Sequence, residues 1–228
     1  IWHKPLHFAV SSNLLQLLLA LGPIMIGFGV YAAAIFHALG DLGSSLSGSF
    51  ISPMLVAGQL IFFLGIAFLG AGWLSRRSGR GVLTRLGLGS ISWATLGWAS
   101  ATTVLLLVVN YLLEFVGQHL GLINLTSEAA KTQTLLQTFS SLPLQIFLAA
   151  SASLGEEIFF RGLLQPKFGI ILTTLAFTLM HIQYNWFGML IVLTIGLGLA
   201  YVRQRRDTTT TILAHFAYDL IGIILIGL

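Results

Sequence analysis

The sequence contains no cysteine and very few charged residues. Of its 228 residues, 8% are charged and 56% are hydrophobic. The absence of cysteine excludes a disulfide framework, a thiolate metal site and a cysteine nucleophile. A soluble domain usually carries about 25% charged residues, so this chain could not cover a water-facing surface. Lipid accepts an apolar exterior, and the composition therefore predicts a multi-pass protein of a cell inner membrane or an organelle membrane.

Long apolar runs occupy most of the chain. A membrane-spanning helix needs about 20 mostly apolar residues. Runs of roughly this kind occur at residues 14–39, 50–74, 91–117, 142–164, 168–186, 187–202 and 208–228. We therefore expect an all-α fold, a polytopic transmembrane helical bundle of about seven spans.

The basic residues indicate how this bundle is oriented. When the seven spans alternate in direction, ten of the eleven Lys and Arg residues fall on the side of the N-terminus. They are Lys4, Arg76, Arg77, Arg80, Arg85, Arg161, Lys167, Arg203, Arg205 and Arg206, and Lys131 alone falls on the other side. This bias is the positive-inside signal, which predicts a cytoplasmic N-terminus. Because the basic residues follow membrane topology, nucleic acid is not an expected partner.

Ionisable residues inside the predicted spans gather in the last third of the chain. They lie in three short patterns, Gly155-Glu156-Glu157-Ile158-Phe159-Phe160-Arg161-Gly162, Phe177-Thr178-Leu179-Met180-His181 and His215-Phe216-Ala217-Tyr218-Asp219. Such groups are costly in lipid and are functional candidates by default. A lone histidine in a membrane helix is more often an interhelical hydrogen-bonding residue. The joint occurrence of the three patterns favours a chemical site.

Spacing suggests a role for each residue. Glu157 and Arg161 are four residues apart on a helix and can form a structural ion pair. Glu156 lies about 100° around the helix from Glu157 and lacks that partner, so its carboxylate is a candidate base. His215 and Asp219 are also four apart and project into the same space. Counting about 1.5 Å per residue places the polar groups of all three patterns at one level of the bilayer.

In this order on successive membrane helices, the patterns EExxxRG, FxxxH and HxxxN/D resemble those of the CPBP family. This family comprises the type II CAAX prenyl endopeptidases and the Abi, or bacteriocin-processing, relatives. The resemblance covers about residues 150–228. It implies an intramembrane endopeptidase with residues 141–228 as its catalytic core and residues 1–140 as N-terminal membrane helices with an interfacial loop. Its partners would be the lipid bilayer and a membrane-associated peptide or protein substrate.

The resemblance also implies catalytic roles. Glu156 and His181 would activate the attacking water, while His215 and Asp219 would stabilise the oxyanion or complete the site. Glu156, His181 and His215 could instead hold zinc with an open water position. We favour the metal-free version, because three ligands would leave Glu157 or Asp219 as the base. Asp219 stands where the family commonly has asparagine, and an ionised aspartate cannot donate to an oxyanion.

Two other functions compete with the peptidase reading. A relative that kept the helical scaffold could act as a non-catalytic assembly or immunity subunit that binds a partner membrane protein, since a fold does not determine a function. Chains of glutamate, histidine and aspartate also line proton and ion paths. A carrier needs polar groups that are reachable from both sides, and the outer halves of the last spans offer few.

Overall fold

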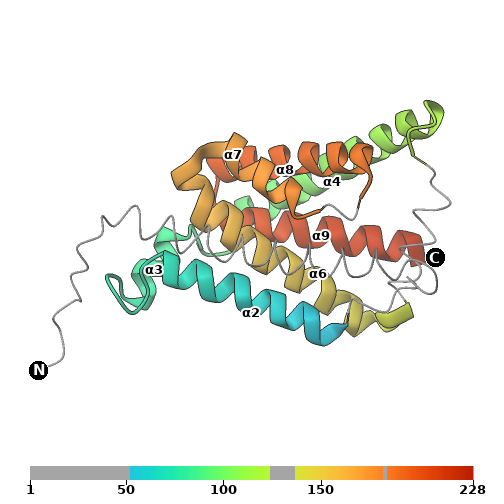
Figure 1. The fold of residues 1–228 in the computed structure, drawn as a ribbon. Helices are drawn as coiled ribbons and strands as arrows, with labels where there is room; N and C mark the ends of the chain where they lie inside the picture. Colours follow the sequence, from blue (N-terminus) through green and yellow to red (C-terminus); the bar gives the residue numbers. More distant parts are fainter. Residues whose placement is uncertain (1–51, 124–136, 182–183, 228) are drawn as a thin grey trace, which may run out of the picture.

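The structure is a computed structural model, and it describes residues 52–123, 137–181 and 184–227. Within these ranges the named elements are all helices, which confirms the predicted all-α class. They are α2 (Pro53–Gly70), α3 (Gly79–Arg85), α4 (Trp93–His119), α6 (Leu142–Glu156), the π-helix η1 (Glu157–Leu164), α7 (Gln165–Leu179), α8 (Trp186–Arg205) and α9 (Thr208–Gly227) (Figure 1).

Five helical stretches are long and apolar enough to cross a membrane. They are Pro53–Gly70, Trp93–His119, Leu142–Leu179, Trp186–Arg205 and Thr208–Leu225. The chain is therefore a multi-pass integral membrane protein. The predicted first span at 14–39 and most of the predicted interfacial loop lie outside the described residues. Seven crossings and a cytoplasmic N-terminus stay predictions.

The predicted boundary between the fourth and fifth spans lies just before the break that the helix shows. α6, η1 and α7 follow one another without a gap, and the helical backbone breaks at Gly169, with φ 74° and ψ 178°. Glycine has no Cβ and adopts such a positive φ readily. Figure 1 shows the chain turning between α6 and the end of α7. The predicted fifth span reached residue 186, but α7 ends at Leu179, which leaves ten residues, or about 15 Å, after the break.

Short polar side chains start most of the long helices. The hydroxyl of Ser52 accepts a hydrogen bond from the backbone N–H of Leu55 at 3.2 Å, and Pro53 follows at the first helical position. Ser92 caps α4 in the same way, and the Asn185 side chain caps α8 by accepting from Gly188 at 2.8 Å. Each cap satisfies one of the backbone donors that a helix start leaves without a partner.

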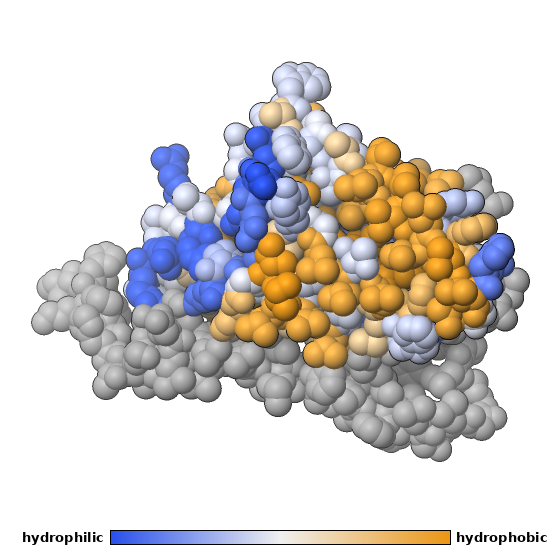
Figure 2. All heavy atoms as spheres, turned by 90° about the horizontal axis from the view of Figure 1, so that it is seen from above, coloured by the Kyte–Doolittle hydropathy of each residue, from blue (hydrophilic) through white to orange (hydrophobic). Residues whose placement is uncertain are grey.

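Helix α9 lies in the middle of the bundle. It packs against α4, α6 and α8, while α2 runs along α6 and α7 runs along α8 (Figure 1). In Figure 2 hydrophobic side chains cover a broad part of the surface, and hydrophilic ones gather at one end. The large exposed side chains are mostly apolar, among them Ile61, Val104 and Leu172. This surface suits a lipid environment.

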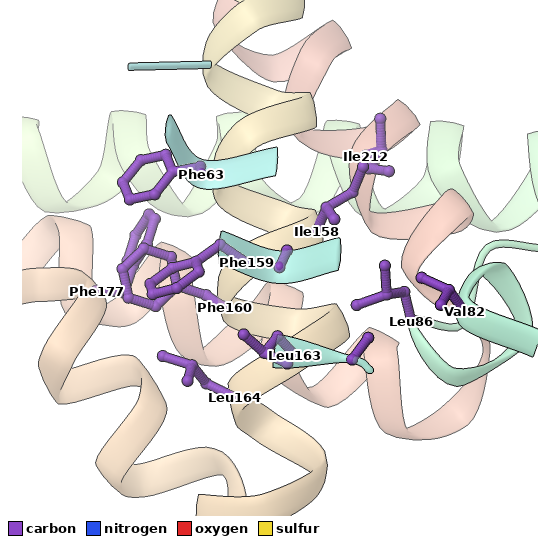
Figure 3. Packing of buried hydrophobic residues seen from close by; sticks show 12 residues of the cluster. Phe63, Val82, Leu86, Ile158, Phe159, Phe160, Leu163, Leu164, Phe177 and Ile212 are labelled. Atoms are coloured by element: carbon purple, nitrogen blue, oxygen red, sulfur yellow. The ribbon is translucent and has the colours of Figure 1, made fainter. Parts of the chain in front are cut away.

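A cluster of aromatic rings forms the core beside the polar residues. Phe63 of α2 stacks on Phe159 with ring centroids 5.0 Å apart, and Phe159 meets Phe160 edge-on at 4.9 Å. Phe160 in turn meets Phe177 of α7 edge-on at 5.3 Å. Figure 3 shows these four rings together between α2, η1 and α7. Edge-on and offset contacts are the favourable arrangements for aromatic pairs, so the cluster holds these helices at fixed distances around the site.

Candidate active site

The first polar pattern lies where helix α6 changes into the π-helix η1. All eight residues of η1 are buried. Glu156, the last residue of α6, is 8% exposed, and Glu157, the first of η1, is 0% exposed. Both neighbouring glutamates are therefore inside the protein. π-helical segments are rare and frequently occur at functional sites.

Glu157 and Arg161 form the predicted ion pair. Arg161 Nη1 lies 3.0 Å from Glu157 Oε1, and both side chains are almost fully buried. Arg161 also donates from Nη2 to the Gly196 carbonyl oxygen of α8 at 3.2 Å, and its guanidinium lies 4.3 Å from the centre of the Phe177 ring. The arginine thus connects η1, α7 and α8. Glu157 supplies the opposite charge that makes its burial tolerable.

His215 of α9 lies between two carboxylates. Its Nδ1 is 2.9 Å from Glu157 Oε1, and its Nε2 is 3.4 Å from Asp219 Oδ2. The Nδ1 contact is a hydrogen bond and the Nε2 contact is an ion-pair distance. Acidic side chains on both sides of the ring favour its positively charged form. Arg161, Glu157, His215 and Asp219 then form a chain of alternating charge. The assignment of Glu157 to Arg161 alone was incomplete, because the same oxygen also binds His215.

Glu156 lies beside this chain without belonging to it. Its charge acts on both His215 and Asp219. Within the described residues its side chain has no hydrogen-bond partner, whereas Glu157 binds Arg161 and His215. The two glutamates therefore differ as the sequence predicted: Glu157 is held by cations, and Glu156 is not.

His181 and His215 both contact the ring of Phe177. His181 Nδ1 lies 2.9 Å from the Phe177 carbonyl oxygen, which can only accept, so Nδ1 carries a proton. The Phe177 ring lies against both His181, with centroids 4.7 Å apart, and His215, at 6.3 Å. His181 also stacks on Tyr184 at 6.4 Å. That Glu156, His181, His215 and Asp219 together form one catalytic site stays a prediction.

The zinc set of Glu156, His181 and His215 does not fit this arrangement. Zinc needs a lone pair from each histidine, and both nitrogens of His215 face carboxylates. Across residues 52–123, 137–181 and 184–227, no group of three or more His, Asp or Glu side chains is placed to hold a metal. We derive no catalytic step through a metal.

One further polar residue, Gln165, was not predicted from the sequence and also binds α8. Gln165 lies four residues after Arg161, and its Nε2 donates to the Ala200 carbonyl oxygen at 2.8 Å. Ala200 lies four residues after Gly196, whose carbonyl accepts from Arg161. The signal was present as two matching i, i+4 spacings. The acceptors could not be recognised, because every residue has a carbonyl oxygen and the sequence does not show which ones accept from a side chain.

The fold and site define a class, that of a multi-pass membrane protein with a buried glutamate–histidine cluster in its C-terminal helices. Residues 138–221 match the family described as Type II CAAX prenyl endopeptidase Rce1-like. The match includes every polar residue of the site and confirms the predicted resemblance for this part of the chain. No curated protein and no solved structure matches the chain.

Proposed function

We propose that this protein is an intramembrane endopeptidase that hydrolyses a membrane-associated peptide or protein with water activated by Glu156. The observation that carries the proposal is the alternating chain of Arg161, Glu157, His215 and Asp219 with the free carboxylate of Glu156 beside it. A structural network needs its charges paired. An additional buried carboxylate without a cation of its own is costly, and a catalytic role explains its presence.

Glu156 is the better candidate base of the two glutamates. Glu157 Oε1 forms an ion pair with Arg161 and a hydrogen bond with His215, so the charge of this carboxylate is held by two cationic side chains. Glu156 is 8% exposed against 0% for Glu157, so water reaches it more easily. His181 can assist from Nε2, because its Nδ1 already donates to the Phe177 carbonyl.

The reaction follows from these positions. Glu156 takes a proton from water as the water oxygen attacks the scissile carbonyl carbon. The carbonyl oxygen becomes an oxyanion, which the positive charge of His215 stabilises. The Nε2 contact of His215 with Asp219 at 3.4 Å is longer than its Nδ1 contact with Glu157 at 2.9 Å, so Nε2 is the donor that can turn to the oxyanion. When the C–N bond breaks, Glu156 returns its proton to the leaving amine.

The experiment compares two substitutions at neighbouring positions. Purified protein in liposomes is given a farnesylated peptide and its unprenylated counterpart in water enriched in ¹⁸O. Hydrolysis places one ¹⁸O in the new carboxylate, which mass spectrometry detects. We expect Glu156→Gln to lower the rate about 10²–10⁴-fold while the protein stays folded. Glu114→Gln is the matched control, because Glu114 is a half-buried membrane glutamate that the mechanism does not use.

One result would replace the peptidase with a non-catalytic scaffold. If Glu156→Gln retains the full biological function while Glu157→Gln unfolds, the charges serve the fold alone. Cleavage of the farnesylated peptide without cleavage of the unprenylated one would show that the prenyl group is part of the substrate. Equal cleavage of the farnesylated and unprenylated peptides would show that the protein is a peptidase that does not require a prenyl group on its substrate.

A further inference from the structure

Several arginines outside the polar site gather at one end of the bundle. Arg85 ends α3, Arg203 lies in the last turn of α8, and Arg77 lies in the link between α2 and α3. Burial, together with the charges of Arg77 and Arg203, lowers the pKa of Arg85. The charge of Lys167 on α7 also interacts with Arg76, Arg77 and Arg85. Figure 2 shows that hydrophilic side chains gather at one end of the molecule.

Acidic residues do not balance this cluster. Among the described residues the other acids lie elsewhere, with Glu156, Glu157 and Asp219 in the site and Glu114 towards the far end of α4. Asp207 does lie beside Arg203. Its Oδ1, however, accepts from both the backbone N–H and the hydroxyl of Thr210 at the start of α9, at 2.8 and 2.7 Å.

The guanidinium groups have donors to spare. Arg77 donates to the Ala71 carbonyl oxygen, and Arg85 donates to the Gly162 carbonyl oxygen at 3.3 Å. Among the described residues, each of these two bonds uses one N–H of the five that an arginine offers. Arg203 Nε is buried and has no hydrogen-bond partner in the described part of the chain. An anion with several oxygens would satisfy these donors and relieve the repulsion.

The backbone around the cluster is fixed in place. Gly87 has a φ of +70°, and a Cβ at this position would collide with the Arg203 guanidinium, 2.8 Å from its Cζ. The Thr208 hydroxyl donates to the Leu86 carbonyl oxygen at 2.6 Å, and Thr208 N–H donates to the Gly87 carbonyl oxygen at 2.9 Å. The start of α9 thus holds the link that supports Arg203. Arg203 is therefore positioned before any ligand arrives.

We propose that Arg77, Arg85 and Arg203 bind the phosphate of an anionic lipid headgroup. Arginine presents a planar set of donors that matches phosphate oxygens. The cluster lies at the end of an apolar bundle, at the level where headgroups meet the hydrocarbon. A lipid is favoured over a soluble anion, because the same end borders the exposed apolar surface that acyl chains would cover (Figure 2).

The test uses the full chain in nanodiscs of phosphatidylcholine with a minor fraction of phosphatidylglycerol. Native mass spectrometry after extraction counts the lipids that stay bound. We expect the wild type to retain phosphatidylglycerol preferentially. Each of Arg77→Gln, Arg85→Gln and Arg203→Gln should weaken retention about fivefold, and the triple variant should weaken it on the order of 100-fold.

Controls separate a site from diffuse attraction. Arg80→Gln and Arg205→Gln remove the same charge near the same end; Arg80 is exposed on α3, and Arg205 lies over the Tyr201 ring at 5.1 Å. Both should retain the lipid, and a loss equal to that of Arg77→Gln would overturn the site. Arg77 is exposed, so its variant should fold, which the unfolding temperature in phosphatidylcholine verifies. If inorganic phosphate raises the unfolding temperature and phosphatidylglycerol does not, the lipid assignment is overturned.

Discussion

Replacing Glu157 with glutamine should destabilise the protein strongly. The substitution keeps the shape of the side chain but removes its charge, and it leaves Arg161, 1% exposed, without an ion pair. Removing one partner of a buried pair costs about 3–5 kcal/mol. The contacts of Arg161 with the Gly196 carbonyl and the Phe177 ring remain, so we expect about 3 kcal/mol, the low end of that range. That is roughly a 100-fold shift towards the unfolded state.

Unfolding in mixed micelles measures this loss. Sodium dodecyl sulfate is titrated into protein held in a mild detergent, and tryptophan fluorescence follows the transition. Glu114→Gln is the control, because Glu114 is also a membrane glutamate but lacks a buried cation. It should unfold near the wild type.

A double replacement tests the cause of the loss. Glu157→Leu with Arg161→Met removes both charges, and apolar replacements of a buried pair are often neutral. The double variant should therefore be more stable than Glu157→Leu alone. The reasoning is refuted if the two single losses simply add, or if Glu157→Gln unfolds together with Glu114→Gln.

Three further predictions concern neighbouring contacts. Gly196→Ala should cost about 1–3 kcal/mol in unfolding free energy, because its Cβ would lie 2.9 Å from Thr174 Cγ2 and 3.1 Å from Phe177 Cδ1, while Gly222→Ala, with nothing within 4 Å, should be neutral or stabilising. Thr208→Val should lower the unfolding temperature, since it leaves the Leu86 carbonyl without a donor and costs about 1–3 kcal/mol. Asp219→Asn should keep peptide cleavage within about tenfold of the wild type, whereas Asp219→Leu should lose it, as the cleavage rates will show.

The membrane class and the Glu157–Arg161 pair were predictable because each follows from local sequence. Composition reports the solvent, and a spacing of four residues reports a shared helix face. The contact between Glu157 and His215 was not predictable in this way. Those residues are 58 positions apart, and the contact depends on how α9 packs against η1. Spacing shows the face of a helix but not the neighbour that the face meets.

The break at Gly169 shows a second limit. Hydropathy separates the fourth and fifth apolar runs at nearly the right place, because Gln165 and Lys167 interrupt them. It does not show that the backbone continues as a helix through both residues and turns at a glycine. Helical hydrogen bonds persist across polar side chains, so an interruption in hydropathy is not an interruption in structure.

The net charge of the site offers an explanation of how Asp219 can take the place of the asparagine that is common in the family. With His215 charged and all three carboxylates ionised, Arg161 and His215 supply two positive charges against three negative ones. An excess charge in a buried cluster is costly, so the five groups are expected to share one proton. Glu157 lies next to two cations, which favour its ionised form, so the shared proton is not expected on Glu157. If Asp219 holds the proton, its hydroxyl becomes a donor, as the amide of asparagine is, and Glu156 remains free to accept a proton from water. Asparagine at position 219 would supply that donor without the extra proton, which is why Asp219→Asn should preserve catalysis while an apolar residue there should not.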